Sequence, residues 1–107
     1  MPDTRFITIG RQEEVPPGEV RIFETEDHRF AVCNVDGRLY AVEDVCTHDD
    51  GPLGEGTLDG FCIECPRHGA QFDVRTGEVA TPPASAPIRS FPLRVKNGEI
   101  QVEIEDD

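Results

Sequence analysis

The fold and the chemistry of this chain depend on residues 46–69, which read CTHDDGPLGEGTLDGFCIECPRHG. Two short motifs stand near the ends of this stretch. The first contains Cys46 and His48, and the second contains Cys65 and His68. Each motif therefore offers one thiolate and one imidazole, and together they supply two sulfur and two nitrogen ligands. Two of the three histidines and two of the four cysteines of the chain fall in these motifs.

This set of side chains suits a [2Fe–2S] cluster whose two irons are held differently. In such a cluster two cysteines hold one iron and two histidines hold the other. Because each motif contains one ligand of each kind, each motif must contribute to both irons, and two short loops clamp the cluster from opposite sides. We therefore expect Cys46, His48, Cys65 and His68 to bind one [2Fe–2S] cluster.

A structural zinc site is the alternative for the same four side chains, because two cysteines and two histidines also suit tetrahedral zinc. Zinc modules usually pair like with like, as two cysteines followed by two histidines. Here cysteine and histidine alternate in both motifs, and a glycine follows each second ligand within a few residues. The order of the ligands favours the iron–sulfur cluster. A non-redox zinc-binding interaction module remains the alternative from another functional class.

The two motifs resemble those of the Rieske proteins. The resemblance covers most of the chain, although only the two loops are highly specific. It implies an all-β fold, namely a Rieske-like antiparallel β-sandwich with a small inserted cluster-binding subdomain at approximately residues 44–81. The length of 107 residues predicts a single Rieske domain, residues 1–107. The proline-rich residues 82–87 would cover the cluster as a third side, with a plain stiff linker as the alternative.

The resemblance also assigns roles within the two loops. The histidine ligands would face outward, so that electrons leave through His48 and His68. Glycines at positions 51, 54, 56 and 69 would let the backbone approach closely and direct amide N–H groups at sulfur.

Short strands separated by turn signals fill the chain, and no long helical period appears. Asp36-Gly37 and Asn97-Gly98 are two-residue hairpin signals between apolar runs. The last strand alternates apolar with polar or charged residues, which indicates one buried and one solvated face. We expect strands at residues 6–9, 19–24, 29–35, 39–42, 61–64, 71–74, 78–80, 91–96 and 99–104.

The chain is strongly acidic, with 22 acidic residues, 10 basic residues and a formal net charge of −12. Such a surface argues against nucleic acid, which needs basic patches. It favours docking to a positively charged protein face, with solubility alone as the alternative explanation. The sequence contains no apolar run of 18 residues, so we expect no transmembrane helix. The charged N-terminus does not match the pattern of a signal peptide. We expect a cytoplasmic monomer with no membrane partner.

The two remaining cysteines do not predict a disulfide framework. Cys33 lies in a strand-like apolar run, where a buried thiol acts as a small hydrophobic side chain. Alternation along residues 61–65 places Phe61, Ile63 and Cys65 on one face and Cys62 and Glu64 on the other, so Cys62 is expected to be an exposed spectator rather than a ligand. Free thiols fit a reducing compartment.

Departures from the high-potential Rieske branch are informative. Respiratory and photosynthetic members join their two loops by a disulfide, at places where this chain has Gly51 and Arg67. They also carry a serine and a tyrosine that donate hydrogen bonds toward the cluster, where this chain has Ala70 and Phe72. Fewer donors, together with the nearby acids Asp49, Asp50 and Asp73, disfavour the addition of an electron. We therefore expect a reduction potential of roughly −150 mV rather than +300 mV.

A low potential suits an electron carrier fed by a flavin-dependent reductase that uses NAD(P)H. The chain resembles the Rieske-type ferredoxins of ring-hydroxylating dioxygenase systems, which implies a terminal oxygenase or similar redox protein as acceptor and no catalysis by the chain itself. An oxygenase would need a second, mononuclear iron site, yet the only other histidine is His28, expected to be exposed at a turn. The alternatives are the small subunit of an assimilatory nitrite reductase and a companion of other iron–sulfur or dioxygenase gene clusters.

Overall fold

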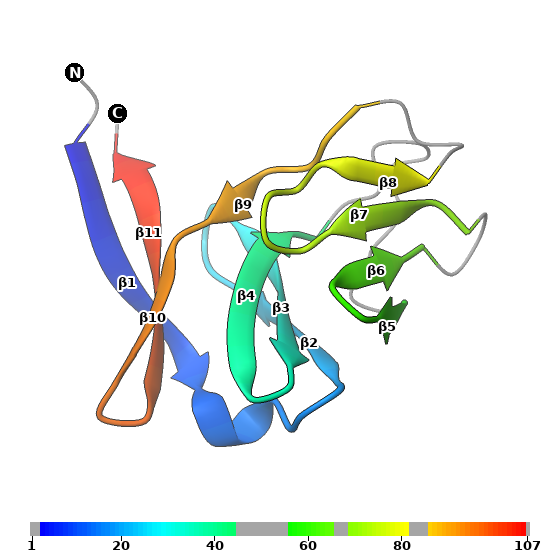
Figure 1. Ribbon diagram of the computed structural model, residues 1–107. Helices are drawn as coiled ribbons and strands as arrows, with labels where there is room; N and C mark the ends of the chain where they lie inside the picture. Colours follow the sequence, from blue (N-terminus) through cyan, green and yellow to red (C-terminus); the bar gives the residue numbers. More distant parts are fainter. Residues whose placement is uncertain (1–2, 45–55, 66–68, 82–85, 107) are drawn as a thin grey trace.

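The computed structural model describes residues 3–44, 56–65, 69–81 and 86–106 (Figure 1). In this part of the chain the strands form three antiparallel sheets, and no α-helix is present. Sheet A has the strand order β1–β11–β10, sheet B has β2–β3–β4–β9, and sheet C has β5–β6–β7–β8. The bounds are β1 Asp3–Arg11, the 3₁₀ helix η1 Gln12–Glu14, β2 Val20–Glu24, β3 Arg29–Val35, β4 Arg38–Glu43, β5 Thr57–Asp59, β6 Cys62–Glu64, β7 Gln71–Asp73, β8 Val79–Thr81, β9 Ser90–Phe91, β10 Leu93–Lys96 and β11 Glu99–Asp106.

The all-β, antiparallel fold predicted from the sequence is confirmed. Sheet B lies between sheet A and sheet C (Figure 1). Sheets A and B form the base, and sheet C lies within the predicted insertion at residues 44–81. No helix in the described residues is long and apolar enough to cross a membrane.

Both predicted hairpins are present, and each turns on a pair of left-handed residues. Asp36 and Gly37 have φ angles of 53° and 93°, and Asn97 and Gly98 have φ angles of 54° and 79°. A turn with two successive positive φ angles matches the right-handed twist of the flanking strands. Asp, Asn and Gly adopt positive φ with little strain. The turns thereby set the register of β3 with β4 and of β10 with β11.

Two details of the strand prediction are wrong. The sequence did not predict β5, a three-residue strand that is held by antiparallel pairing with β6. The single strand expected at residues 91–96 is divided at Pro92 into β9, which joins sheet B, and β10, which joins sheet A. Proline has no N–H to donate to a ladder, so the chain changes sheets at that residue.

Strand β3 is buried on both faces and separates two hydrophobic clusters. Its residues alternate, so Phe30 and Val32 face the cluster shared with sheet A, while Ala31 and Cys33 face the cluster shared with sheet C. All four are fully buried. This explains why the sequence of β3 is a nearly continuous apolar run rather than an alternating one.

Two backbone hydrogen bonds fasten sheet C to sheet B. The Ile88 N–H donates to the Gly77 carbonyl oxygen (2.9 Å), and the Glu43 N–H donates to the Arg89 carbonyl oxygen (2.8 Å). Gly77 lies in the turn between β7 and β8 with a φ of 84°, and a Cβ atom at this position would collide with the Ile88 carbonyl oxygen. Glycine is therefore required here both for its conformation and for the close approach of two backbones.

Replacing Gly77 tests the importance of this connection. Gly77→Ala should destabilise the fold more than Gly60→Ala does, because Gly60 has a similar positive φ but nothing lies within 4 Å of an added Cβ. Left-handed strain alone predicts a loss of about 1–2 kcal/mol for Gly60→Ala. Gly77→Ala should cost at least about 2 kcal/mol more, since it also displaces Ile88 from its hydrogen bond. Urea unfolding followed by circular dichroism measures both, and equal losses would contradict the account.

Candidate metal centre

The structure describes one of the four predicted ligands, Cys65. The other three, Cys46, His48 and His68, lie outside the described residues. Residues 51 and 67, which replace the cysteines of the high-potential branch, also lie outside them. The described residues give the strand ends that lead into the two loops and the surroundings of Cys65.

One row of cross-strand pairs brings these strand ends together. Thr57 pairs with Glu64, Glu64 pairs with Gln71, and Gln71 pairs with Thr81. The row thus joins the start of β5, the end of β6, the start of β7 and the end of β8 at one end of sheet C. Figure 1 shows the tips of β6 and β8 beside the start of β7. The Thr81 hydroxyl also donates to the Gln71 side-chain oxygen (3.1 Å).

Three connections of the chain reach sheet C at this end. The connection from β4 enters β5, the connection that begins at Cys65 joins β6 to β7, and the proline-rich connection leaves β8. The first contains Cys46 and His48, and the second contains Cys65 and His68. The row therefore places the end of the first connection, at Thr57, beside both ends of the second connection, at Glu64 and Gln71.

The second loop is closed at its base by two backbone hydrogen bonds. The Cys65 N–H donates to the Ala70 carbonyl oxygen (2.7 Å), and the Gly69 N–H donates to the Cys65 carbonyl oxygen (3.1 Å). Gly69 has a φ of 75°, a conformation that glycine adopts without strain. The expectation that the Gly69 amide points at sulfur is wrong, because this amide donates to the carbonyl oxygen that closes the loop.

Cys65 is a free thiol in an apolar environment. It is 2% exposed and belongs to the same cluster as Ile63, Ala70 and Phe72, all three fully buried. The predicted burial pattern is confirmed for Ile63 and Cys65, but Phe61, which was expected on the same face, is 40% exposed. A free thiol that is shielded from water at the base of a short loop fits the sulfur ligand of an iron–sulfur cluster. The donor set and the surroundings of Cys65 are therefore compatible with the predicted cofactor.

The other two cysteines are poor competitors for metal. Cys33 is fully buried, and burial followed by the negative charge of Asp44 raises the pKa of its thiol to about 12. Cys62 is partly buried rather than fully exposed as predicted, and desolvation followed by the charges of Asp73 and Asp59 raises its pKa. Both thiols stay protonated at neutral pH, whereas the thiolate is the form that binds metal. The described residues contain no group of three side chains suited to a metal ion.

Two further residues support the approach to the first loop, and the sequence did not single them out. Asp44 follows β4 directly, and its buried carboxylate lies 3.1 Å from the Arg29 guanidinium. The Asp44 N–H donates to the Arg29 carbonyl oxygen (3.1 Å). The sequence signal that could have identified Asp44 is the position of a charged residue at the end of an apolar strand. This ion pair fixes the chain where it leaves sheet B toward Cys46.

The prediction that His28 is exposed is wrong. Its ring is partly buried, stacks on Phe30 with ring centroids 5.6 Å apart, and meets the edge of Phe91 at 6.1 Å. The turn that carries it is held by the His28 N–H, which donates to the Thr25 hydroxyl (3.1 Å). His28 therefore has a packing role beside the core shared by sheets A and B.

The all-β fold and the two cysteines and two histidines of the sequence fit an iron–sulfur protein of the Rieske class. Residues 5–92 match the family model of the Rieske [2Fe-2S] domain, and the chain belongs to this family. The family description specifies an iron–sulfur cluster as the cofactor.

Several relatives are named as ferredoxin components of dioxygenase systems. The chain is 40% identical over 92 residues to the biphenyl dioxygenase ferredoxin subunit of Pseudomonas sp. (strain KKS102). This alignment covers 85% of this chain and 84% of that protein. The ferredoxin of Sphingomonas yanoikuyae B1 is 32% identical with a TM-score of 0.88, covering 94% of this chain and 99% of that one. A chain in the complex of reduced oxygenase and oxidized ferredoxin in carbazole 1,9a-dioxygenase is 39% identical with a TM-score of 0.87, covering 95% of each. The resemblance seen in the two motifs is confirmed.

Proposed function

We propose that this chain is a one-electron carrier, a Rieske-type ferredoxin that accepts electrons from an NAD(P)H-dependent flavin reductase and passes them to a terminal oxygenase or similar redox protein. The observation that carries the proposal is the convergence of the two motif-bearing connections at one end of sheet C. The relatives support it, since several are named as ferredoxin components of dioxygenase systems and most of their length aligns with this chain.

In this proposal Cys46 and Cys65 hold one iron and His48 and His68 hold the other. When bound there, a [2Fe–2S] cluster supplies a site that gains and loses a single electron. The Cys65–Ala70 hydrogen bond keeps the ends of the second loop together, and the apolar cluster around Cys65 keeps water from its sulfur. The Arg29–Asp44 ion pair holds the stem of the first loop. These contacts hold Cys65 and the stems of the two loops, which would limit the reorganisation that accompanies a change in the charge of a bound cluster.

The buried residues beside Cys65 favour a low reduction potential. Ala70 and Phe72 are fully buried in the same cluster as Cys65 and carry no hydroxyl group that could donate to a sulfur atom. Asp73 contributes less than the sequence suggested, because Arg75 pairs with both of its oxygens at 3.0 Å and 2.8 Å. These hydrogen bonds lower the pKa of Asp73, so its charge persists at neutral pH but is offset locally. The missing hydroxyl donors are thus the main reason to expect a potential of roughly −150 mV.

The net charge of −12 supports redox partners with positively charged docking faces. Cytoplasmic location, a monomeric state and a single domain over residues 1–107 remain part of the proposal. Among the described residues, Cys33 and Cys62 are not proposed ligands and form no disulfide, which agrees with a reducing compartment.

Changing the histidine ligands tests the proposed ligation. His48→Cys or His68→Cys should remove the mixed sulfur and nitrogen ligation, and with it the rhombic electron paramagnetic resonance spectrum of the reduced protein. Cys62→Ser is the control, since its partly buried thiol is not a proposed ligand. Iron and acid-labile sulfide should both be present at two per wild-type chain. An unchanged spectrum in both histidine variants, or one zinc ion without sulfide in the wild type, would refute the proposal.

Returning the missing hydroxyl groups tests the account of the potential. The double variant Ala70→Ser with Phe72→Tyr should have a higher reduction potential, because O–H donors stabilise the more negative reduced state. We expect an increase of about 60 mV or more, which corresponds to a tenfold change in a one-electron equilibrium. Ala41→Ser is the matched control, because Ala41 is equally buried but belongs to the cluster between sheets A and B. Protein-film voltammetry measures the shift, and the account fails if the double variant moves no further than the control.

A further inference from the structure

A long groove follows one edge of β4, away from the metal centre. It consists of two hollows of about 680 Å³ and 450 Å³. The first lies between the segment after η1, the β3–β4 turn and β10, and the second extends from β4 toward the β7–β8 turn and β9. Both hollows are lined by Arg38, Leu39 and Leu93, so they adjoin, and together they are called the groove below.

The edge of β4 is open along the part of this groove at residues 38–40. On one side β4 pairs with β3 over its whole length, from Arg38 to Glu43. On the other side β9 pairs only with Ala41 and Val42, because the chain then leaves for sheet A. Within the described residues no strand pairs with the groove side of residues 38–40. An open strand edge presents backbone groups that an extended peptide can pair with.

The charge of the groove is opposite to that of the molecule. The chain has 22 acidic and 10 basic residues, yet the groove is lined by three arginines and one acid, Glu13. Glu13 is already paired with Arg11 at 3.0 Å. Two of the arginines are also engaged, since Arg75 binds Asp73 and Arg94 donates to the Gln101 side chain (2.7 Å).

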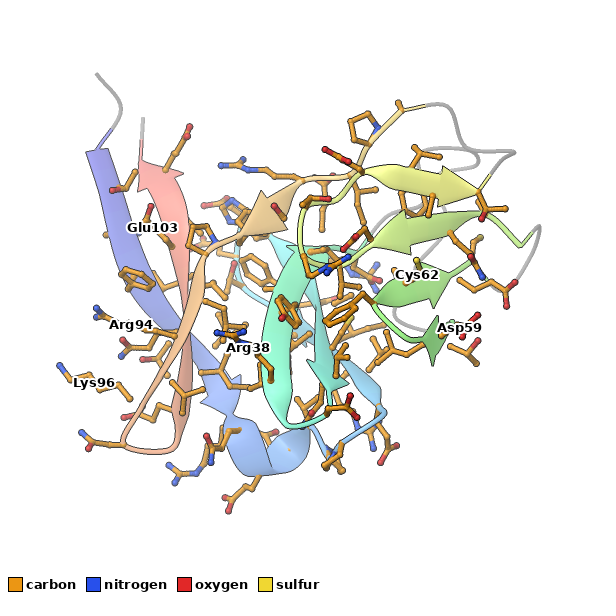
Figure 2. All side chains as sticks on the ribbon, viewed as in Figure 1. Arg38, Asp59, Cys62, Arg94, Lys96 and Glu103 are labelled. Atoms are coloured by element: carbon orange, nitrogen blue, oxygen red, sulfur yellow. The ribbon has the colours of Figure 1, made fainter. Side chains whose placement is uncertain are left out.

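Arg38 is the cation that remains available. It is exposed, and it forms no ion pair with any described residue. Figure 2 shows Arg38 on the side of β4 that faces β10, whereas Lys96 extends from the outer end of the β10–β11 hairpin. A guanidinium in this position can bind a carboxylate through two parallel hydrogen bonds.

Exposed apolar side chains lie at both ends of the groove. Val95 and Phe61 are the exposed large hydrophobic residues of the described chain, at 42% and 40%. Val95 lines the first hollow. Phe61 lies beside the second, under the Arg75 guanidinium at 4.0 Å and against the edge of Tyr40. Apolar contacts at both ends and a cation between them suit an extended ligand better than a compact one.

We propose that this groove binds an extended segment of a partner protein in which apolar side chains alternate with carboxylates. The segment pairs with the open edge of β4 and places one carboxylate on Arg38. The proposal is independent of the function assigned above, because the groove contains no proposed metal ligand. Arg38 begins β4, and the first ligand loop follows the other end of that strand, about 17 Å away at the rise of an extended strand. A partner can therefore hold the groove while the cluster end stays accessible.

A short peptide tests the proposal. The probe is a blocked hexapeptide of alternating Glu and Val, titrated into the full cluster-loaded chain and followed by amide chemical shifts. The amides of residues 38–40 and 93–95 should shift together. Arg38→Glu should weaken binding by about tenfold or more through loss of the charged pair. Lys96→Glu makes the same change in net charge at an exposed residue that lines neither hollow, and it should leave the affinity within about twofold.

Several results would overturn the proposal. The proposal is contradicted if the Glu-Val hexapeptide does not bind, or if Arg38→Glu and Lys96→Glu weaken its binding equally. It is also contradicted if a control hexapeptide of alternating Lys and Val binds equally tightly. Retained affinity of a hexapeptide with N-methylated backbone amides would exclude pairing with the strand edge. A concentration-dependent dimer in sedimentation that disappears in Arg38→Glu would assign the groove to a second copy of this chain instead. Arg38→Gln, which only removes the charge, should also lose affinity and guards against an artefact of the reversed charge.

Discussion

The site depends on one row of backbone pairs across sheet C. Thr57, Glu64, Gln71 and Thr81 are held side by side, and each lies where a connection enters or leaves the sheet. Two loops that share four ligands, as we propose for this chain, need fixed starting points, because a displacement of one loop would separate the proposed ligands of both irons. Short antiparallel strands satisfy this need, because the end of one strand and the start of the next lie at the same end of the sheet. The small sheet is thus a frame that converts distant sequence positions into neighbours.

The frame in turn depends on its attachment to the base. Strand β3 is buried on both faces and contributes side chains to both hydrophobic clusters, one on each face. Residues 88 and 89 add a backbone connection, because one is bonded to Gly77 of sheet C and the other to Glu43 of sheet B. Glu43 directly precedes Asp44, whose ion pair with Arg29 holds the chain that leads to the first loop. The same few residues therefore hold the sheets together and position the stem of a ligand loop.

Some of this could be predicted from the sequence because the signals are local. Asp36-Gly37 and Asn97-Gly98 specify turns by their own conformational preferences, and the two motifs specify a ligand set by residue type and order. Other features depend on distant partners. The strand β5 exists because β6 pairs with it, and Gly77 is needed because Ile88 passes close by. His28 is partly buried because two phenylalanines from different strands lie against it.

The central claim is that His48 and His68 ligate iron together with Cys46 and Cys65. Electron–nuclear double resonance of the reduced protein, prepared with and without nitrogen-15 histidine, tests this claim most directly. The account predicts strong couplings from two histidine nitrogens that change with the isotope. A reduced iron–sulfur signal without such couplings would contradict it.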